Sequence, residues 1–170
     1  MTLPPISVRD ASLGDLEAIN AIYNHYVPIS TTTYDYAPMG MDERRAWFTG
    51  RSAMHPATVA ERGREIVGFG SLHAFRARIG YRWAVENSVY VHPDHQRTGV
   101  GSAILADLVD RARRHGVHTI VAGIDAEQAA SVALHAKFGF VEVGRFPEVG
   151  RKFERWLDVI FMQLMLGSED

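Results

Sequence analysis

The sequence of 170 residues contains no cysteine. Zinc fingers and thioredoxin-like motifs are therefore excluded, as are disulfide scaffolds and a cysteine nucleophile. The sequence also has no excess of basic residues, because its formal net charge is -2. Nucleic acid is not an expected partner of a chain with this charge.

Signals for export and membrane insertion are missing as well. The first residues, Met1–Pro5, lack the basic and apolar stretch of a secretory signal, and no hydrophobic run is long enough to span a bilayer. No repeat, low-complexity segment or linker divides the chain. We therefore expect one domain over residues 1–170, located in the cytoplasm and without a membrane partner.

Hydrophobic periodicity predicts a series of strands and helices. Strands are expected at 6–9, 57–61, 66–72, 82–91, 119–124, 140–145 and 156–166, and helices at 16–26, 42–48, 99–115 and 127–138. Ser12 and Asp15 have the spacing of a capping box, and Asp42 is the expected cap of the second helix. Pro147 and Gly150 indicate a loop between the last two strands. This order predicts an α/β fold with a mixed sheet.

The most informative stretch runs from residue 89 to residue 102. A strand stops at Pro93, and the chain enters the next helix through Gly99 and Gly101. Glycines allow the backbone to approach a ligand closely, and the N-terminus of the following helix favours an anion such as pyrophosphate. The stretch has neither the G-x-x-x-x-G-K-[ST] phosphate loop nor the third glycine of the dinucleotide fingerprint. Taken alone, it is weak evidence for an anion site.

The segment Gln96–Gly101, Gln-Arg-Thr-Gly-Val-Gly, resembles the Q/R-x-x-G-x-G/A acetyl-CoA motif of the GNAT superfamily of N-acetyltransferases. Segments at 24–26, 81–91, 131–140 and 156–158 resemble its phosphinothricin and methionine sulfoximine N-acetyltransferase branch, and the resemblance covers residues 6–166. It implies the GNAT fold, a mixed, mostly antiparallel sheet with a central splayed pair of parallel strands, flanked by helices. It also implies a homodimer that uses acetyl-CoA to acetylate the α-amino group of a small amino-acid analogue such as phosphinothricin, methionine sulfoximine or methionine sulfone.

The resemblance implies which residues hold acetyl-CoA. The pantetheine arm is expected to pair with the backbone of Val89, Tyr90 and Val91, in the opening between the splayed strands. The pyrophosphate is expected on backbone N–H groups of the next loop, contributed by Arg97, Thr98, Gly99, Val100, Gly101 and Ser102. Gln128 and Lys137 are implied as further contacts. Gln128 stands where the branch has asparagine, and its longer side chain shifts or removes the expected hydrogen bond.

Two side chains are candidates for acid–base chemistry. An ammonium acceptor must lose a proton before it attacks a thioester, and the resemblance places the branch's catalytic carboxylate at Glu86. His135 stands where the superfamily often has a tyrosine that protonates the leaving thiolate. Backbone N–H groups near Tyr90 and Val91 are expected to polarise the thioester carbonyl.

The expected acceptor-binding residues form two segments that match the branch, Arg76, Ala77 and Arg78 in the first and Glu86, Asn87 and Ser88 in the second. A guanidinium is a suitable partner for the carboxylate of an amino acid. The apolar side of this pocket has three candidates, Tyr34, Trp83 and Trp156. Arg151 and Glu154 depart from the apolar residue and the glycine expected in the loop before Trp156, so the shape of that loop stays open.

Several alternatives stay open on the sequence alone. His92 and His95 lie in one turn, but no third ligand accompanies them, and no metal site is predicted. The acceptor could instead be a polyamine, an aminoglycoside or a protein N-terminus, although the net charge is unfavourable for polycations. A module that senses acyl-CoA without turnover is a further alternative, against which Glu86 argues.

Overall fold

The computed structural model describes residues 4–167. Met1–Leu3, the first part of the N-terminal stretch without an export signal, lie outside the described residues. The strands are β1 (Ile6–Asp10), β2 (Ala57–Arg62), β3 (Glu65–Ala74), β4 (Ala84–Val91), β5 (Thr119–Asp125), β6 (Val141–Lys152) and β7 (Arg155–Met165). The α-helices are α1 (Leu16–Tyr26), α2 (Met41–Thr49), α3 (Val100–Arg114) and α4 (Ala129–Lys137). Short 3₁₀ turns form at Leu13–Asp15, Ile79–Tyr81 and Pro93–His95. None of the helices in residues 4–167 is long and apolar enough to cross a membrane.

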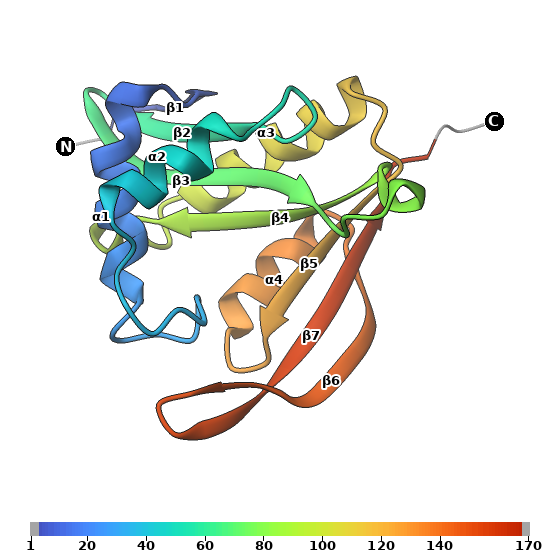
Figure 1. The fold of residues 1–170 in the computed structure, drawn as a ribbon. Helices are drawn as coiled ribbons and strands as arrows, with labels where there is room; N and C mark the ends of the chain where they lie inside the picture. The colour runs from blue at the N-terminus through green and yellow to red at the C-terminus, as the bar shows by residue number, and fades with distance from the viewer. Residues whose placement is uncertain (1–3, 168–170) are drawn as a thin grey trace.

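The strands form one sheet in the order β1-β2-β3-β4-β5-β7-β6 (Figure 1). All neighbouring strands in it are antiparallel except β4 and β5, which are parallel. The predicted mixed, mostly antiparallel sheet with a central parallel pair is thereby confirmed.

The parallel pair separates soon after it forms. β4 and β5 are paired only from Ala84↔Thr119 to Glu86↔Val121, although β4 continues to Val91 and β5 to Asp125. Beyond Glu86 the two strands diverge, as Figure 1 shows, and the sheet has a gap at its centre. This is the splayed pair that the resemblance implied.

Helices cover the two faces of the sheet unequally (Figure 1). We call the face that carries α1 and α2 the front, and the face that carries α3 and α4 the back. On the back, the apolar side of α3 is fully buried against residues such as Val85 and Ile120. On the front, α1 packs on Val59 and Phe69. No helix of the described residues crosses the front of β5, β7 and β6, so this part of the sheet is bare.

Most predicted elements are present, with corrections at their ends. Helix α2 is capped by Gly40 rather than by Asp42, which lies in its first turn. Strand β4 begins at Ala84, because residues 79–81 form a 3₁₀ turn, and α4 begins at Ala129 with Gln128 as its cap. The loop expected around Pro147 and Gly150 was wrong: both residues lie within β6, where the pairing with β7 is irregular. The chain reverses instead at Phe153 and Glu154.

Candidate active site

The edge of β4 that faces the gap exposes main-chain groups. His92 N–H donates to Val67 O at 2.8 Å, and Phe75 N–H donates to Ala84 O at 3.3 Å. Hydrogen-bonded pairs alternate along an antiparallel ladder, so residues 88 and 90 bond to β3, whereas the N–H and C=O of Val89 and Val91 point into the gap. Tyr26 Oη donates to Val91 O at 2.5 Å.

The register therefore separates the three residues predicted to pair with the pantetheine arm. Val89 and Val91 present free backbone N–H groups to the gap. The N–H of Tyr90 is paired with Phe69 in β3 and is not available to polarise a thioester, contrary to the sequence-based expectation for that residue. The Tyr90 ring stacks on the Phe69 ring on the front face, at 5.0 Å between centroids.

A cavity of about 360 Å³ extends from the gap to the beginning of α3. Gly99 caps this helix with a φ of 91°, a left-handed conformation that favours glycine. The first hydrogen bond of helix α3 runs from Ala103 N–H to Gly99 O. The N–H groups of residues 100–102 therefore have no partner within the helix. Arg97 is exposed beside them and lines the same cavity. Unpaired N–H groups, the helix dipole and a guanidinium together suit a bound pyrophosphate.

Gly101 has a second reason to lack a side chain. A Cβ atom there would lie 3.2 Å from Leu134 Cδ2, tighter than an ordinary van der Waals contact. Gly101 therefore also lets α3 approach α4 closely, which the sequence motif did not indicate.

The gap itself holds a smaller cavity of about 140 Å³. Its walls come from β4, β5, α4 and the α1–α2 loop, contributed by Thr31, Thr32, Asn87, Ser88, Val89, Tyr90, Ala122, Gly123, Ile124, Asp125, Gln128, Ser131 and His135. His135 belongs to the back layer, whereas the loop with Thr31 and Thr32 belongs to the front. The cavity therefore passes through the sheet between its two faces.

Glu86 lies on the front at the place where the strands separate. Its side chain is 29% exposed, and Oε2 lies 3.7 Å from His73 Nε2 on β3. A Cβ built on Gly123 would be 3.3 Å from Glu86 Oε1, so the carboxylate lies directly beside the gap. Val121, its partner on β5, lines a front cavity of about 420 Å³ that Arg76 and Phe161 also line. Glu86 thus stands between the gap and the front cavity.

His135 lies in the opposite wall and is 3% exposed. Burial lowers its pKa below the usual value, although the Ser131 carbonyl acts in the other direction. The neutral ring donates from Nδ1 to Ser131 O at 2.8 Å and accepts at Nε2 from Asn87 Nδ2 at 2.9 Å. Asn87 Oδ1 is buried without a hydrogen-bond partner. A buried acceptor of this kind is costly unless a ligand satisfies it.

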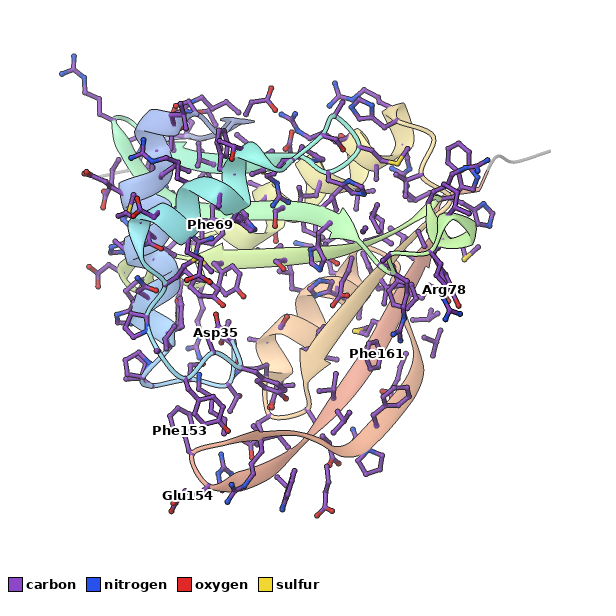
Figure 2. The ribbon with its side chains drawn as sticks, in the orientation of Figure 1. Asp35, Phe69, Arg78, Phe153, Glu154 and Phe161 are labelled. Atoms are coloured by element: carbon purple, nitrogen blue, oxygen red, sulfur yellow. The ribbon has the colours of Figure 1, made fainter. Side chains whose placement is uncertain are left out.

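The predicted acceptor residues are brought together only in part. Arg76 lines the front cavity with its guanidinium 5.2 Å from the Phe75 ring centroid, and Ser88 lines the gap. Ala77 and Arg78 are exposed in the connection between β3 and β4; Figure 2 shows Arg78 at this end of the strands, remote from Phe153 and Glu154. Asn87 faces His135 on the back, away from Arg76.

The two further cofactor residues have different positions. Gln128 lines both the gap and the larger cavity, and its Nε2 donates to Thr31 Oγ1 at 3.0 Å. Lys137 is exposed at the end of α4 and lines neither of them.

The α1–α2 loop, which contributes Thr31 and Thr32 to the gap, meets the β6–β7 hairpin close to the hairpin tip at Phe153 and Glu154 (Figure 2). The Lys152 side chain is buried, and its Nζ donates to Ser30 O at 2.7 Å and to Thr33 O at 2.6 Å. Tyr34 Oη donates to Asp125 Oδ2 at 2.7 Å, and burial together with Asp125 raises the pKa of Tyr34. Lys152 was not predicted from the sequence.

The other two aromatic candidates lie elsewhere. Trp83 is half exposed and lines a separate hollow with His118. Trp156 is exposed, with the Arg151 guanidinium 5.5 Å from its ring centroid. Of these three candidates, Tyr34 hydrogen-bonds to a residue that lines the gap, Asp125.

Unpaired N–H groups at the start of α3 lie at one side of the gap and the Glu86 carboxylate at the other, an arrangement that can hold an anionic carrier next to a group that accepts a proton. Comparisons with known proteins agree. Residues 19–140 match the model of the acetyltransferase (GNAT) family. The L-amino acid N-acyltransferase MnaT of Escherichia coli K12 is 44% identical over 164 residues, covering 96% of this chain and 95% of that protein.

Two further proteins are similar over nearly their whole length. The L-methionine sulfoximine/L-methionine sulfone acetyltransferase of Salmonella typhimurium is 42% identical, with 96% of each chain covered. The crystal structure of a phosphinothricin acetyltransferase from Sinorhizobium meliloti in complex with acetyl-CoA superposes with a TM-score of 0.89 at 36% identity, covering 95% of this chain and 89% of that one. The chain belongs to the GNAT acetyltransferase family.

Proposed function

We propose that this protein is an N-acetyltransferase that transfers the acetyl group of acetyl-CoA to the α-amino group of a small amino-acid analogue, of the methionine sulfoximine, methionine sulfone or phosphinothricin type. The observation that carries the proposal is the gap between β4 and β5. It joins an anion-binding cavity at the start of α3 to the Glu86 carboxylate on the front. The named activities of the Salmonella and Sinorhizobium relatives support the choice of cofactor and acceptor.

The residues present fit acetyl-CoA. The main-chain edge at Val89 and Val91 can pair with the amides of the pantetheine arm, because an unsatisfied strand edge accepts an extended ligand. The N–H groups of Val100, Gly101 and Ser102 can bind the pyrophosphate at the helix end. Asn87 Oδ1 offers a buried acceptor for one further N–H group in the gap. Acetyl-CoA supplies the acetyl thioester.

Glu86 acts as the general base in this proposal. The acceptor arrives as an ammonium ion and becomes a nucleophile only after losing a proton. The Glu86 carboxylate lies beside the gap and is also reached by solvent, so it can take that proton and release it to water. Because general base catalysis typically contributes about 10²- to 10⁴-fold, this proton transfer is a major part of the proposed rate enhancement.

His135 fits a positioning role better than the proton-donor role expected from the sequence. Both ring nitrogens are engaged, and the lowered pKa favours the neutral ring, whose Nε2 carries no proton. In this form His135 holds the Asn87 amide with its Oδ1 directed away from the imidazole. We therefore assign to His135 the orientation of Asn87, a residue that would touch the cofactor.

Arg76 is the proposed partner of the acceptor's carboxylate. Its guanidinium borders the front cavity, whose other walls include Val121, Phe146 and Phe161. A cationic group beside an apolar hollow suits a zwitterionic amino acid with an extended side chain.

We further propose that the protein is cytoplasmic and forms a homodimer through the bare front of β7 and β6. Val141, Val143, Phe146 and Met165 are each more than half exposed on these strands. Contiguous apolar surface of this kind marks an interaction site. A monomeric mass of the wild type in light scattering would contradict the homodimer. A dimeric mass that persists in Phe146→Glu would contradict this interface.

Release of CoA with acetyl-CoA and a panel of amino acids and analogues tests the activity. A thiol reagent reports CoA directly, because the protein itself has no cysteine to react. We expect turnover with methionine sulfone, methionine sulfoximine or phosphinothricin, and none with their N-acetylated forms. Acetyl-CoA binding without CoA release for any amine would contradict the proposal.

A further inference from the structure

Three potential metal ligands meet at the beginning of the cofactor loop. Glu65 is the first residue of β3, His92 caps the 3₁₀ turn that follows β4, and His95 is the last residue of that turn. One ligand atom from each of these side chains lies within 4.8 Å of the others. The sequence showed the two histidines without a third ligand, because Glu65 lies 27 positions before His92.

The backbone holds the two histidines on one side of the turn. His95 N–H donates to His92 O at 2.9 Å, and side chains three residues apart are eclipsed in a 3₁₀ turn. The two imidazole centroids are 5.6 Å apart. Pro93 fixes the first position of the turn, so this arrangement exists before any ion binds.

The third ligand comes from the neighbouring strand. His92 N–H donates to Val67 O at 2.8 Å, which ties the turn to β3 close to its start. Glu65 Oε1 lies 3.3 Å from His95 Nε2, a separation close to that of two ligands on one tetrahedral ion. To bring all three ligand atoms to the distance required by one ion, only the Glu65 and His92 side chains need to rotate. They are 58% and 31% exposed.

Asp94 can support such a site from the second coordination sphere. Its carboxylate lies 4.0 Å from His92 Nδ1. A metal-bound histidine commonly donates its other ring N–H to a carboxylate, which orients the ring and increases its basicity. In the ion-free structure His92 Nδ1 accepts a hydrogen bond from Asp94 N–H at 3.3 Å. If His92 binds zinc through Nε2, the ring must rotate away from this N–H, and Nδ1 can then donate to the Asp94 carboxylate. An adjoining hollow between α1 and the turn, lined by His25, Glu65 and His92, leaves room for a water as fourth ligand.

We propose that Glu65, His92 and His95 bind one Zn²⁺ ion per chain. Two imidazoles and one carboxylate form a donor set that zinc binds tetrahedrally at about 2.0–2.2 Å. The ion takes no part in acetyl transfer. It joins β3 to the turn whose last residue leads into Gln96 and Arg97, and thereby stiffens the loop at the pyrophosphate cavity.

Titration calorimetry of the untagged, chelator-treated full chain with zinc chloride tests the proposal. We expect one ion per chain, and a loss of affinity of about 10-fold or more in Glu65→Gln, His92→Gln and His95→Gln. His115→Gln, which changes an exposed histidine at the end of α3, is the matched control and should bind as the wild type does. Circular dichroism shows whether each variant is folded.

A second measurement separates this site from adventitious binding. Zinc should raise the thermal midpoint of the wild type and of His115→Gln, because a ligand that binds only the folded state stabilises it, and should not raise that of His95→Gln. Absence of zinc binding in the wild type would overturn the proposal. So would binding that is equally strong in all three ligand variants. The readout is independent of the acetyltransferase assay, so failure here leaves the proposed function untouched.

Discussion

The carboxylate of Glu86 lies beside the one residue of β5 that has no side chain to displace it, Gly123. A Cβ atom at position 123 would be 3.3 Å from Glu86 Oε1 and 3.4 Å from Phe161 Cε1. The first distance is tighter than most contacts of a real Cβ atom, and the second is at the lower limit of an ordinary van der Waals contact. Gly123 therefore gives the proposed base its position at the edge of the gap, and this relationship leads to the first two predictions.

Replacement of Glu86 by glutamine should lower kcat by about 10²- to 10⁴-fold, because the amide cannot accept the proton of the ammonium substrate. Acetyl-CoA affinity, measured by calorimetry, should be nearly unchanged. The defect should shrink at high pH, where more of the acceptor is already a free amine. Glu142→Gln, an exposed position on β6, serves as control. Near-normal turnover of Glu86→Gln at neutral pH would contradict the role of Glu86.

Gly123→Ala should displace the Glu86 carboxylate while keeping its charge. A misplacement of the order of 1 Å can cost about 10²-fold in rate, so kcat should fall by about 10- to 100-fold with a folded protein. Gly40→Ala is the control, because a Cβ at this position before α2 has no atom within 4 Å and Gly40 does not line the front cavity. Equal kcat values for the two variants would show that Gly123 does not position the base.

The role of His135 can be decided from the pH dependence of kcat. If the neutral ring positions Asn87, His135→Gln should retain most of the activity, because the glutamine carbonyl can accept from Asn87 Nδ2. Wild-type kcat should then decline as the pH falls through the lowered pKa of His135, since the imidazolium can no longer accept at Nε2, and should be level above it. If His135 instead donated a proton, kcat would fall as the pH rises, and His135→Gln would lose most of its activity.

Acceptor selection should depend on Arg76 and not on Arg78. Arg76→Ala should raise the KM for methionine sulfone by about tenfold, equivalent to about 1.4 kcal/mol, with acetyl-CoA affinity unchanged. The carboxamide of the substrate should be poor with the wild type and no worse with the variant. Arg78→Ala, which alters an exposed guanidinium in the same segment, is the control. A normal preference of Arg76→Ala for the free acid would assign the carboxylate to another group.

At position 154 of the β6–β7 turn, glycine should be more stable than the glutamate that is present. Phe153 and Glu154 have φ values of 51° and 59°, a left-handed conformation that costs a residue with a side chain about 1 kcal/mol or more. Glu154→Gly should therefore raise the thermal midpoint by about 2–4 °C. Glu142→Gly, at an extended position of β6, should lower it. A lower midpoint for Glu154→Gly in scanning calorimetry would show that its side chain stabilises the turn.

The sequence was informative where local chemistry determines the structure. Periodicity located the strands and helices, and Gly99 and Gly101 marked the entry to α3, where the structure adds that Gly99 has a left-handed conformation. The tip of the β6–β7 hairpin was missed, because phenylalanine and glutamate have no preference for that conformation, while Pro147 and Gly150 gave a false loop signal.

Other features of the site depend on distant pairing and cannot be predicted from local sequence. The availability of the Tyr90 N–H follows from the register between β3 and β4, not from the residue itself. The burial of Lys152 could not be predicted from local sequence either, because lysine is rarely buried and the two carbonyl groups that accept from it belong to the distant α1–α2 loop. Glu65 meets His95 only because a hairpin strand returns beside the turn.

The contacts of Lys152 have a consequence for biosynthesis. They join residues that are 119 and 122 positions apart, so the position of the α1–α2 loop depends on segments made early and late in translation. A nascent chain that has emerged as far as α4 already contains Glu86, Gly123 and His135, yet lacks the hairpin that meets the α1–α2 loop. Until the hairpin forms, the backbone carbonyls of Ser30 and Thr33 lack the Lys152 ammonium group that holds them in the folded protein. The proposed base and the residues that position it are therefore synthesised before the hairpin that holds the α1–α2 loop in place.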